Sequence, residues 1–180
     1  MREGLVLKEL DKSDLRPDLL AHFIRFQEVK RALRKEDGEW VLRDVDFTEY
    51  WDDEDKREII DEDLTDCLKS GGFIWGVFDD GRLIGFACLL TKFFGRENQY
   101  LQLSQLHVSA DYRGVGAGKA LLFAAAQKAK ELGAKKIYIS AHSAEESQKF
   151  YERVGCVDVA EVNERLVEIE PYDRQMEYGV

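Results

Sequence analysis

The chain has little proline and no long apolar run. Only two of its 180 residues are proline, too few for a rigid linker between domains. No apolar run approaches the roughly 20 residues that a membrane-spanning helix needs. The first residues, Met1 to Gly4, lack the apolar stretch of a signal peptide. We therefore expect a single domain over residues 1–180, located in the cytoplasm and not in a membrane.

Cysteine and net positive charge are scarce as well. The three cysteines, Cys67, Cys88 and Cys156, are scattered, odd in number and form no Cys-x-x-Cys pair. This pattern predicts small core residues in a reducing compartment, and we expect no metal site. The net charge of −10 disfavours a nucleic acid partner, because a phosphate backbone requires a basic surface. The acidity fits a cationic small molecule as partner, or it only serves solubility.

Glycine, in contrast, is concentrated in one stretch. Residues 111–122 read Asp-Tyr-Arg-Gly-Val-Gly-Ala-Gly-Lys-Ala-Leu-Leu. An apolar extended segment precedes this stretch at residues 101–108. A helical pattern follows it, with one apolar face made of Leu121, Ala125, Ala129 and Leu132. The glycines therefore lie at the junction of a strand and a helix.

This junction has the chemistry of an anion site. The first amides of a helix have no partner within the helix, and the helix dipole makes that end electropositive. Gly114, Gly116 and Gly118 lack a Cβ atom, so the backbone can curl and approach a ligand closely. Arg113 and Lys119 add positive charge at either end. The combination predicts a cradle for a phosphate group.

Two common phosphate motifs do not fit. A Walker loop requires an early glycine where this chain has Arg113, and a hydroxyl for magnesium where it has Ala120. A dinucleotide fingerprint requires a third glycine where this chain has Lys119, whose side chain would obstruct helix–strand packing.

The motif that fits is Arg-x-x-Gly-x-Gly, at Arg113, Gly116 and Gly118. With Leu-His-Val at 106–108 before it and Phe-Tyr-Glu-Arg-Val-Gly at 150–155 after it, the motif resembles the GNAT superfamily of acyl-CoA-dependent N-acyltransferases. In that family the loop holds the pyrophosphate of coenzyme A. The alternative reading of the residues is a tight structural turn.

The strand before the loop is irregular. The apolar residues Leu101 and Leu103 occupy odd-numbered positions, whereas Leu106 and Val108 occupy even-numbered positions. A strand repeats every two residues, so this change predicts a bulge near residues 104–105. The resemblance implies the same bulge, with the strand diverging from its neighbour to admit the pantetheine arm.

The fold implied is mixed α/β (α+β): a GNAT-like, mostly antiparallel central sheet of about six to seven strands, with a bulged, splayed strand pair and about four flanking helices. An Asp-Asp-Gly turn at 79–81 between two apolar runs predicts a hairpin. We expect helices from Pro17 to Gly38, after a Thr48 cap, and after a capping box of Ser143 and Glu146. We also expect residues 157–169 to form one strand or a pair of strands, and residues 175–178 to form an edge strand.

The resemblance implies which residues hold acetyl-CoA. The residues expected to bind the cofactor are Leu106, His107, Val108, Arg113, Gly114, Val115, Gly116, Ala117, Gly118, Lys119 and Ser143. The family often has Asn seven residues before its tyrosine and Ala four before it, where this chain has Ala144 and Ser147. Ser143 is expected to replace that Asn in bonding the pantetheine arm.

Tyr151 is the expected general acid, because it lies near the start of the helix that follows the splayed strand and the family often places its acid in this Phe-Tyr motif. The alternative is an ordinary half-buried tyrosine bonded to a backbone carbonyl. The base stays open among His107, His142 and an acidic side chain of the connection at 44–66, acting through water. That connection carries twelve acids against two bases, most of them expected to face solvent.

The function expected from these features is acetyl transfer from acetyl-CoA to the primary amine of a small cationic molecule. The amine would attack the thioester directly, with Tyr151 as acid and His107 as a second catalytic residue. The alternatives are a non-catalytic acyl-CoA-binding domain and a protein or peptide N-acetyltransferase. The acceptor would be a small molecule rather than nucleic acid or membrane, and the chain a monomer or homodimer.

Overall fold

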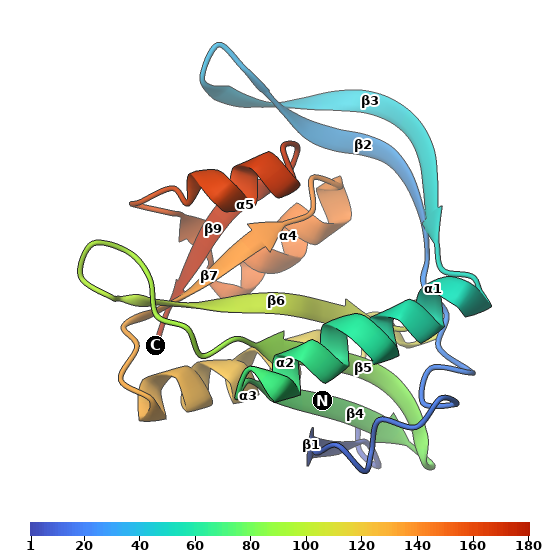
Figure 1. Ribbon diagram of the computed structural model, residues 1–180. Helices are drawn as coiled ribbons and strands as arrows, with labels where there is room; N and C mark the ends of the chain where they lie inside the picture. Colours follow the sequence, from blue (N-terminus) through green and yellow to red (C-terminus); the bar gives the residue numbers. More distant parts are fainter.

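The computed structural model describes all 180 residues and contains one large sheet and one separate hairpin (Figure 1). The large sheet has seven strands in the order β1-β4-β5-β6-β7-β9-β8, and β2 and β3 form the hairpin. All neighbouring pairs are antiparallel except β6 and β7. The strands are β1 Val6–Leu10, β2 Phe26–Glu36, β3 Glu39–Tyr50, β4 Phe73–Asp79, β5 Arg82–Leu89, β6 Tyr100–Val108, β7 Lys136–Ala141, β8 Val157–Asp158 and β9 Arg174–Gly179. The expected mixed, mostly antiparallel sheet is confirmed.

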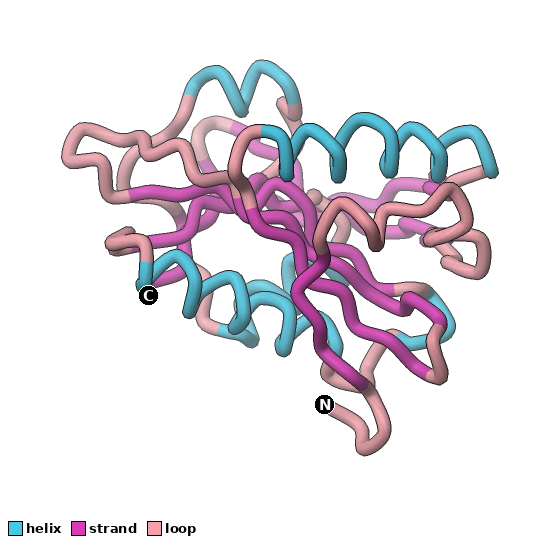
Figure 2. Tube along the Cα trace, turned by 60° about the horizontal axis from the view of Figure 1, so that its bottom comes forward, coloured by secondary structure: helices cyan, strands magenta, loops and turns pink.

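Helices cover both faces of the sheet. Figure 2 shows the strands between two helical layers. On one face α3 (Ala117–Glu131) and α4 (Glu145–Val154) pack against the larger apolar core. On the other face α1 (Asp53–Glu58), a π-helical turn and α2 (Thr65–Lys69) form one continuous helical run over a second core. With α5 (Glu164–Ile169) this makes four helical segments, the number expected.

The predicted bulge in β6 is confirmed. Cys88 pairs with Gln105 and Leu89 pairs with Leu103, so Ser104 has no opposite residue in β5. The extra residue restores the alternation of the strand. As a result the apolar side chains on both sides of the bulge all pack in the core beneath α3, namely Leu101, Leu103, Leu106 and Val108.

The predicted splay is also present. β6 and β7 are paired only from Tyr100 to Leu103, against Lys136 to Ile139. Beyond this point β6 runs on to Val108 and β7 to Ala141, with no pairing between them. A gap therefore opens between the carboxyl ends of these two strands. This gap is called the splay below.

The prediction of a helix from Pro17 to Gly38 is wrong. The segment instead forms a turn-rich stretch and then β2, which pairs with β3 along its length. Burial alternates at the start of β2, where Gln27 and Val29 are buried and their neighbours are exposed. The turn at the tip is Asp37-Gly38, both with positive φ (48° and 88°), which is the conformation of a type I′ hairpin. Gly38 thus closes a hairpin and not a helix.

Three smaller expectations are also wrong. Thr48 lies in β3, and Asp52 caps α1 in a capping box with Asp55. Ser143 does not cap α4, because Ala144 occupies the N-cap position. Within 157–169 only Val157–Asp158 is a strand. The rest leads to α5, because the Asn163 side chain accepts the Leu166 amide and starts a helix there.

β9 is extended, as expected, but it is not an edge strand. It lies between β7 and β8, so its backbone is hydrogen-bonded on both sides over part of its length. The short β8 is the edge. This position buries the side chains of β9, among them Met176 and Glu177.

Strand β2 crosses the open end of the splay. At its start the Ile24 carbonyl accepts the Ala110 amide at 2.8 Å, just after β6. Further along, the Leu33 amide donates to the Ser143 carbonyl at 2.8 Å, in the link between β7 and α4. Ala32 also bridges to Ala144, and both alanines are fully buried. One strand therefore connects the two diverging strand ends (Figure 1).

A buried carboxylate ties the start of β6 to β7 and β9. Glu177 accepts hydrogen bonds from the Tyr100 hydroxyl and Lys136 Nζ, both at 2.5 Å, and from the Ala160 amide at 3.2 Å. Because these bonds satisfy charged and polar groups within the core, the network should stabilise the paired end of the two strands.

Replacing this carboxylate should destabilise the fold. We expect Glu177→Ala to lower the free energy of unfolding by about 2–4 kcal/mol, since it leaves buried donors without an acceptor. The matched control is Glu97→Ala, which breaks an exposed pair with Lys135 and should cost less than about 1 kcal/mol. Urea denaturation followed by tryptophan fluorescence measures both, and equal losses would contradict a structural role of the network.

Candidate active site

The glycine loop forms an amide cradle at the start of α3. Gly114 and Gly116 have φ of 83° and 88°, values that other residues rarely adopt. The first bond of the helix runs from the Ala120 amide to the Gly116 carbonyl at 3.1 Å. The amides of Ala117, Gly118 and Lys119 consequently have no acceptor within the helix and can bind an anion.

The third glycine of the motif serves packing. A Cβ on Gly118 would lie 3.2 Å from the ring of Phe150 on α4 and 3.6 Å from Val108. Gly118 therefore lets α3 and α4 approach each other beside the end of β6. At Gly116 a Cβ would lie 3.0 Å from Met1 Cα, and the Arg2 amide donates to the Val115 carbonyl at 2.9 Å.

The two cations of the loop, Arg113 and Lys119, have no close carboxylate partner. Arg113 donates to the Phe26 carbonyl at 2.9 Å, and its nearest carboxylate oxygen, on Glu146, lies 3.9 Å away. Lys119 Nζ lies 5.3 Å from the ring centroid of Phe123 and forms no ion pair. A diphosphate at the loop would meet both charges without competition from a close carboxylate.

The two faces of β6 differ at the splay. Leu106 and Val108 pack toward α3, whereas His107 lies on the opposite face, against Trp51 at a centroid distance of 4.8 Å. His107 Nε2 lies 2.7 Å from Gln105 Oε1. Burial, helped by the charge of Arg25, lowers the pKa of His107 to about 3. The imidazole is therefore neutral at physiological pH and a very weak base.

Tyr151 lies on α4 and packs in the core that α3 and α4 cover. Its residue is only 9% exposed, and its hydroxyl forms no hydrogen bond with any protein group. Burial raises the pKa of Tyr151, with smaller contributions from Cys156 and Asp173. The alternative of a phenol bonded to a backbone carbonyl is not found. The group is a protonated phenol with its hydrogen-bonding capacity unused.

A set of titratable residues lies on the His107 face, and we call it the splay cluster: Arg25, Glu49, His107, His142 and Asp173. The Arg25 side chain is 11% exposed and forms an ion pair with Glu49 at the end of β3. Glu49 Oε1 lies 2.8 Å from His142 Nε2, just beyond β7. Bonds from His142 and the charge of Arg25 lower the pKa of Glu49 against the effect of burial. The cluster spans the splay from one strand end to the other.

Sequence reasoning found only part of this cluster. The sequence offers His107 and His142 as candidate bases, and Glu49 lies in the acidic connection at 44–66. Arg25 was missed because its segment was interpreted as helix. Asp173 was missed because no motif surrounds it, and only strand pairing brings it near His142.

The remaining predicted residues divide between the site and its surroundings. Ser143 is 3% exposed, and its hydroxyl accepts a hydrogen bond from Arg34 Nη1 at 3.0 Å. Three aromatic residues of the hairpin and its link to α1 differ in position. Trp51 contacts His107, whereas Tyr50 is exposed and Trp40 lies near the hairpin tip beside Lys35.

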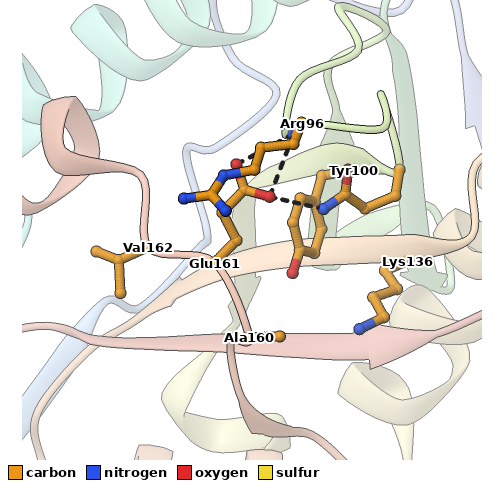
Figure 3. A pocket seen from close by; sticks show the side chains of 7 residues that line it. Arg96, Tyr100, Lys136, Ala160, Glu161 and Val162 are labelled. Carbon is orange, nitrogen blue, oxygen red and sulfur yellow. Dashed lines mark hydrogen bonds between the residues drawn. The ribbon is translucent and has the colours of Figure 1, made fainter.

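Two surface hollows lie away from the splay, at the start of β6. Figure 3 shows one of about 340 Å³ at the start of β6, where Glu161 binds the Arg96 amide and Gln99. Val108, at the other end of β6, is about 25 Å away at the rise of an extended strand. The hollow is lined by Arg96, Gln99, Tyr100, Lys136, Ala160, Glu161 and Val162.

Two further classes of feature are absent. No group of three or more His, Cys, Asp or Glu side chains is arranged to hold a metal ion. No helix has the length and apolar character to span a bilayer.

Comparison with known proteins identifies the family. Residues 37–156 match the sequence model of the acetyltransferase (GNAT) family. The chain belongs to the GNAT family of acetyltransferases. The match includes the splayed strand, the glycine loop and α4. No curated protein matches the chain.

Solved structures share the fold over nearly the whole chain. A Bacillus anthracis protein assigned as a streptothricin acetyltransferase, in complex with acetyl coenzyme A, has a TM-score of 0.67 and 21% identity, with 96% of this chain and 95% of that one covered. A nourseothricin acetyltransferase has a TM-score of 0.66 and 17% identity, covering 97% and 96%. PaiA N-acetyltransferase from Thermoplasma acidophilum, with coenzyme A, has a TM-score of 0.58 and 17% identity, covering 98% and 99%.

This GNAT chain is an acetyl-CoA-dependent acetyltransferase. The residues present fit the donor: unpaired amides and two cations lie at the loop, and a strand with free backbone groups borders the splay. When bound, acetyl-CoA supplies an activated acetyl group, and the chain has to place it, exclude competing water and move protons.

A carboxylate placed in the loop should repel the diphosphate. Gly114 has a positive φ and open space around the position of a Cβ, so Gly114→Asp adds charge without a clash. Like charges at about 4 Å repel by roughly 1–4 kcal/mol at a protein surface, so the Kd for acetyl-CoA should rise about tenfold or more. Isothermal titration calorimetry measures this change.

The control is Gly133→Asp at the other end of α3. Gly133 has a φ of 94° and equally open surroundings, so it carries the same backbone strain away from the loop. Its variant should bind acetyl-CoA like the parent. If both variants bind equally well, the loop does not hold the diphosphate.

Proposed function

We propose that the chain transfers the acetyl group of acetyl-CoA to the primary amine of a small cationic molecule, by direct attack with Tyr151 as general acid. The observation that carries this proposal is Tyr151 itself, which is only 9% exposed and protonated, with a hydroxyl bonded to no protein group. Such a hydroxyl is free to donate to the departing sulfur.

The donor lies along the splay in this proposal. Its diphosphate binds the residues of the loop, namely Arg113, Gly114, Val115, Gly116, Ala117, Gly118 and Lys119. Its pantetheine amides pair with the backbone of Leu106, His107 and Val108, which has no strand partner on the β7 side. Ser143 contributes a further polar group at the link to α4.

The acid step follows from the pKa of the phenol. Because burial raises the pKa of Tyr151, the group stays protonated at neutral pH and can give its proton to the departing thiolate. His107, named above as a second catalytic residue, cannot accept a proton efficiently with a pKa of about 3. Its part in this proposal is to supply backbone groups and to pack against Trp51.

The acceptor side is acidic and covered. Asp63 reaches Gln105 of β6 at 3.3 Å, and burial raises the pKa of this carboxyl, with help from Glu62 and Asp66. β2 crosses the splay and narrows the approach. These features favour a small cationic amine over an amine on a folded protein. Two structural neighbours are named for the small molecules streptothricin and nourseothricin.

A thiol-release assay with acetyl-CoA tests the proposal. The acceptor panel is streptothricin, spermidine, an aminoglycoside, free amino acids and basic peptides. Turnover of small amines supports it. Turnover of peptides alone supports the peptide acetyltransferase instead, and silence with tight acetyl-CoA binding supports the non-catalytic domain.

Removing the phenol hydroxyl should separate binding from catalysis. We expect Tyr151→Phe to lower kcat by about 10²–10⁴-fold, because it removes a positioned acid, and to leave the Kd for acetyl-CoA unchanged. Tyr178→Phe is the matched control: Tyr178 packs edge-on against Phe123 on the far side of the core, and its loss should not alter kcat. An unchanged kcat in Tyr151→Phe would exclude the acid role.

A further inference from the structure

The side chains of β7 and β9 lie alternately on the two faces of the sheet. Ile139, Ala141 and Met176 belong to the core beneath α3 and α4. The alternate residues lie on the other face, where Gln175 Nε2 donates to Ser140 Oγ at 3.0 Å. Asp173 follows the same alternation and therefore lies on this second face, which is also the face of His107 and the hairpin.

Strand register places Asp173 at the end of the splay. Ser140 pairs with Gln175 and Ala141 with Arg174, so the next position brings Asp173 opposite His142. The neighbouring Tyr172 ring lies 4.8 Å from the guanidinium of Arg34 on β2. The segment before β9 thus borders the covered space between β2 and the two strand ends.

Most members of the splay cluster already have partners. Glu49 forms an ion pair with Arg25 and also bonds His142 Nε2. His142 Nδ1 accepts the Ala144 amide at 3.3 Å, so both of its ring nitrogens are used. His107 is bonded to Gln105. The Asp173 carboxylate forms no ion pair, which leaves it as the member of the cluster able to accept a proton.

We propose that Asp173 is the catalytic base that takes a proton from the acceptor ammonium before the amine attacks acetyl-CoA. This inference rests on the function proposed above and assigns a residue to its missing step. His142, held by Glu49, lies beside Asp173 on the same face.

The proton balance is complete without another reactant. The ammonium R–NH₃⁺ gives one proton to the Asp173 carboxylate, and that proton later leaves to solvent. The amine nitrogen forms a bond to the thioester carbon while the carbon–sulfur bond breaks. Tyr151 protonates the thiolate and recovers a proton from the new amide nitrogen. The products are the acetylamine, coenzyme A and one proton.

The electrostatics around Asp173 suit a base. The pKa of Asp173 is raised to about 6, chiefly by burial; Glu170 and Glu49 also raise it, whereas His142 and the Ser140 hydroxyl lower it. The Tyr151 phenol on α4 faces the same carboxyl. Such a carboxyl is ionised at neutral pH, yet it accepts a proton more readily than an ordinary aspartate.

The test is the pH profile of Asp173→Asn with acetyl-CoA and streptothricin or spermidine as acceptor. For the parent, kcat/KM should rise with pH through about 6, as the carboxyl ionises. The variant should lose about 10²-fold or more at pH 7, chiefly in kcat. It should recover toward the parent at high pH, where an amine with a pKa near 10 deprotonates by itself.

Two further variants separate catalysis from structure. Asp158→Asn removes an exposed aspartate bonded to Arg174 and should keep the parent profile. Glu170→Gln removes a charge that raises the pKa of Asp173, so its acidic limb should move to lower pH while the plateau rate stays. Calorimetry with acetyl-CoA should give parent-like Kd values for all three variants.

The outcomes are distinguishable. Turnover by the parent with an unchanged profile in Asp173→Asn overturns the base and leaves the proposed function intact. No turnover by the parent on any amine overturns both. A carbon-13 carboxyl titration checks the charge state independently: a resonance with a midpoint near 6 that Asp173→Asn removes supports the base, and a midpoint near 4 overturns it.

Discussion

The site depends on the point at which strands β6 and β7 stop pairing. β6 and β7 are joined for four residues each and then diverge, which leaves residues 104–108 of β6 without a strand partner on the β7 side. Unpaired backbone in a protein interior is costly unless another partner satisfies it. In the proposed binding mode, the pantetheine amides of acetyl-CoA would supply that partner. The bulge at Ser104 makes the arrangement possible, because it turns Leu106 and Val108 back into the core while the strand bends away.

The polar and charged groups of the site lie on the two faces of this opening. The face of α3 and α4 offers the amide cradle, the cations and the Tyr151 phenol. The opposite face offers the ion-paired and carboxylate side chains of the splay cluster, closed by β2. In the proposed reaction the thioester would lie between the phenol of Tyr151 and the carboxylate of Asp173, and the two groups would act on different atoms.

The sequence predicted local features well and distant ones poorly. The bulge followed from the change of parity between Leu103 and Leu106, and the hairpin turn at 79–81 followed from its Asp-Gly. The β2–β3 hairpin was missed although Asp37-Gly38 carries the same turn chemistry, because a helical spacing of apolar residues competed with a period of two. Asp173 carries no local signal. Its neighbours come from β3, β7 and α4, and only the register of the folded sheet brings them together.

The attachment of β2 to the sheet has one more consequence. The strand is fastened at both strand ends, yet its tip at Asp37-Gly38 projects beyond them. A hairpin can gain or lose residues in cross-strand pairs at its tip without disturbing the register near its base. The length of the hairpin can therefore change at its tip while the pairing of β2 across the splay is kept.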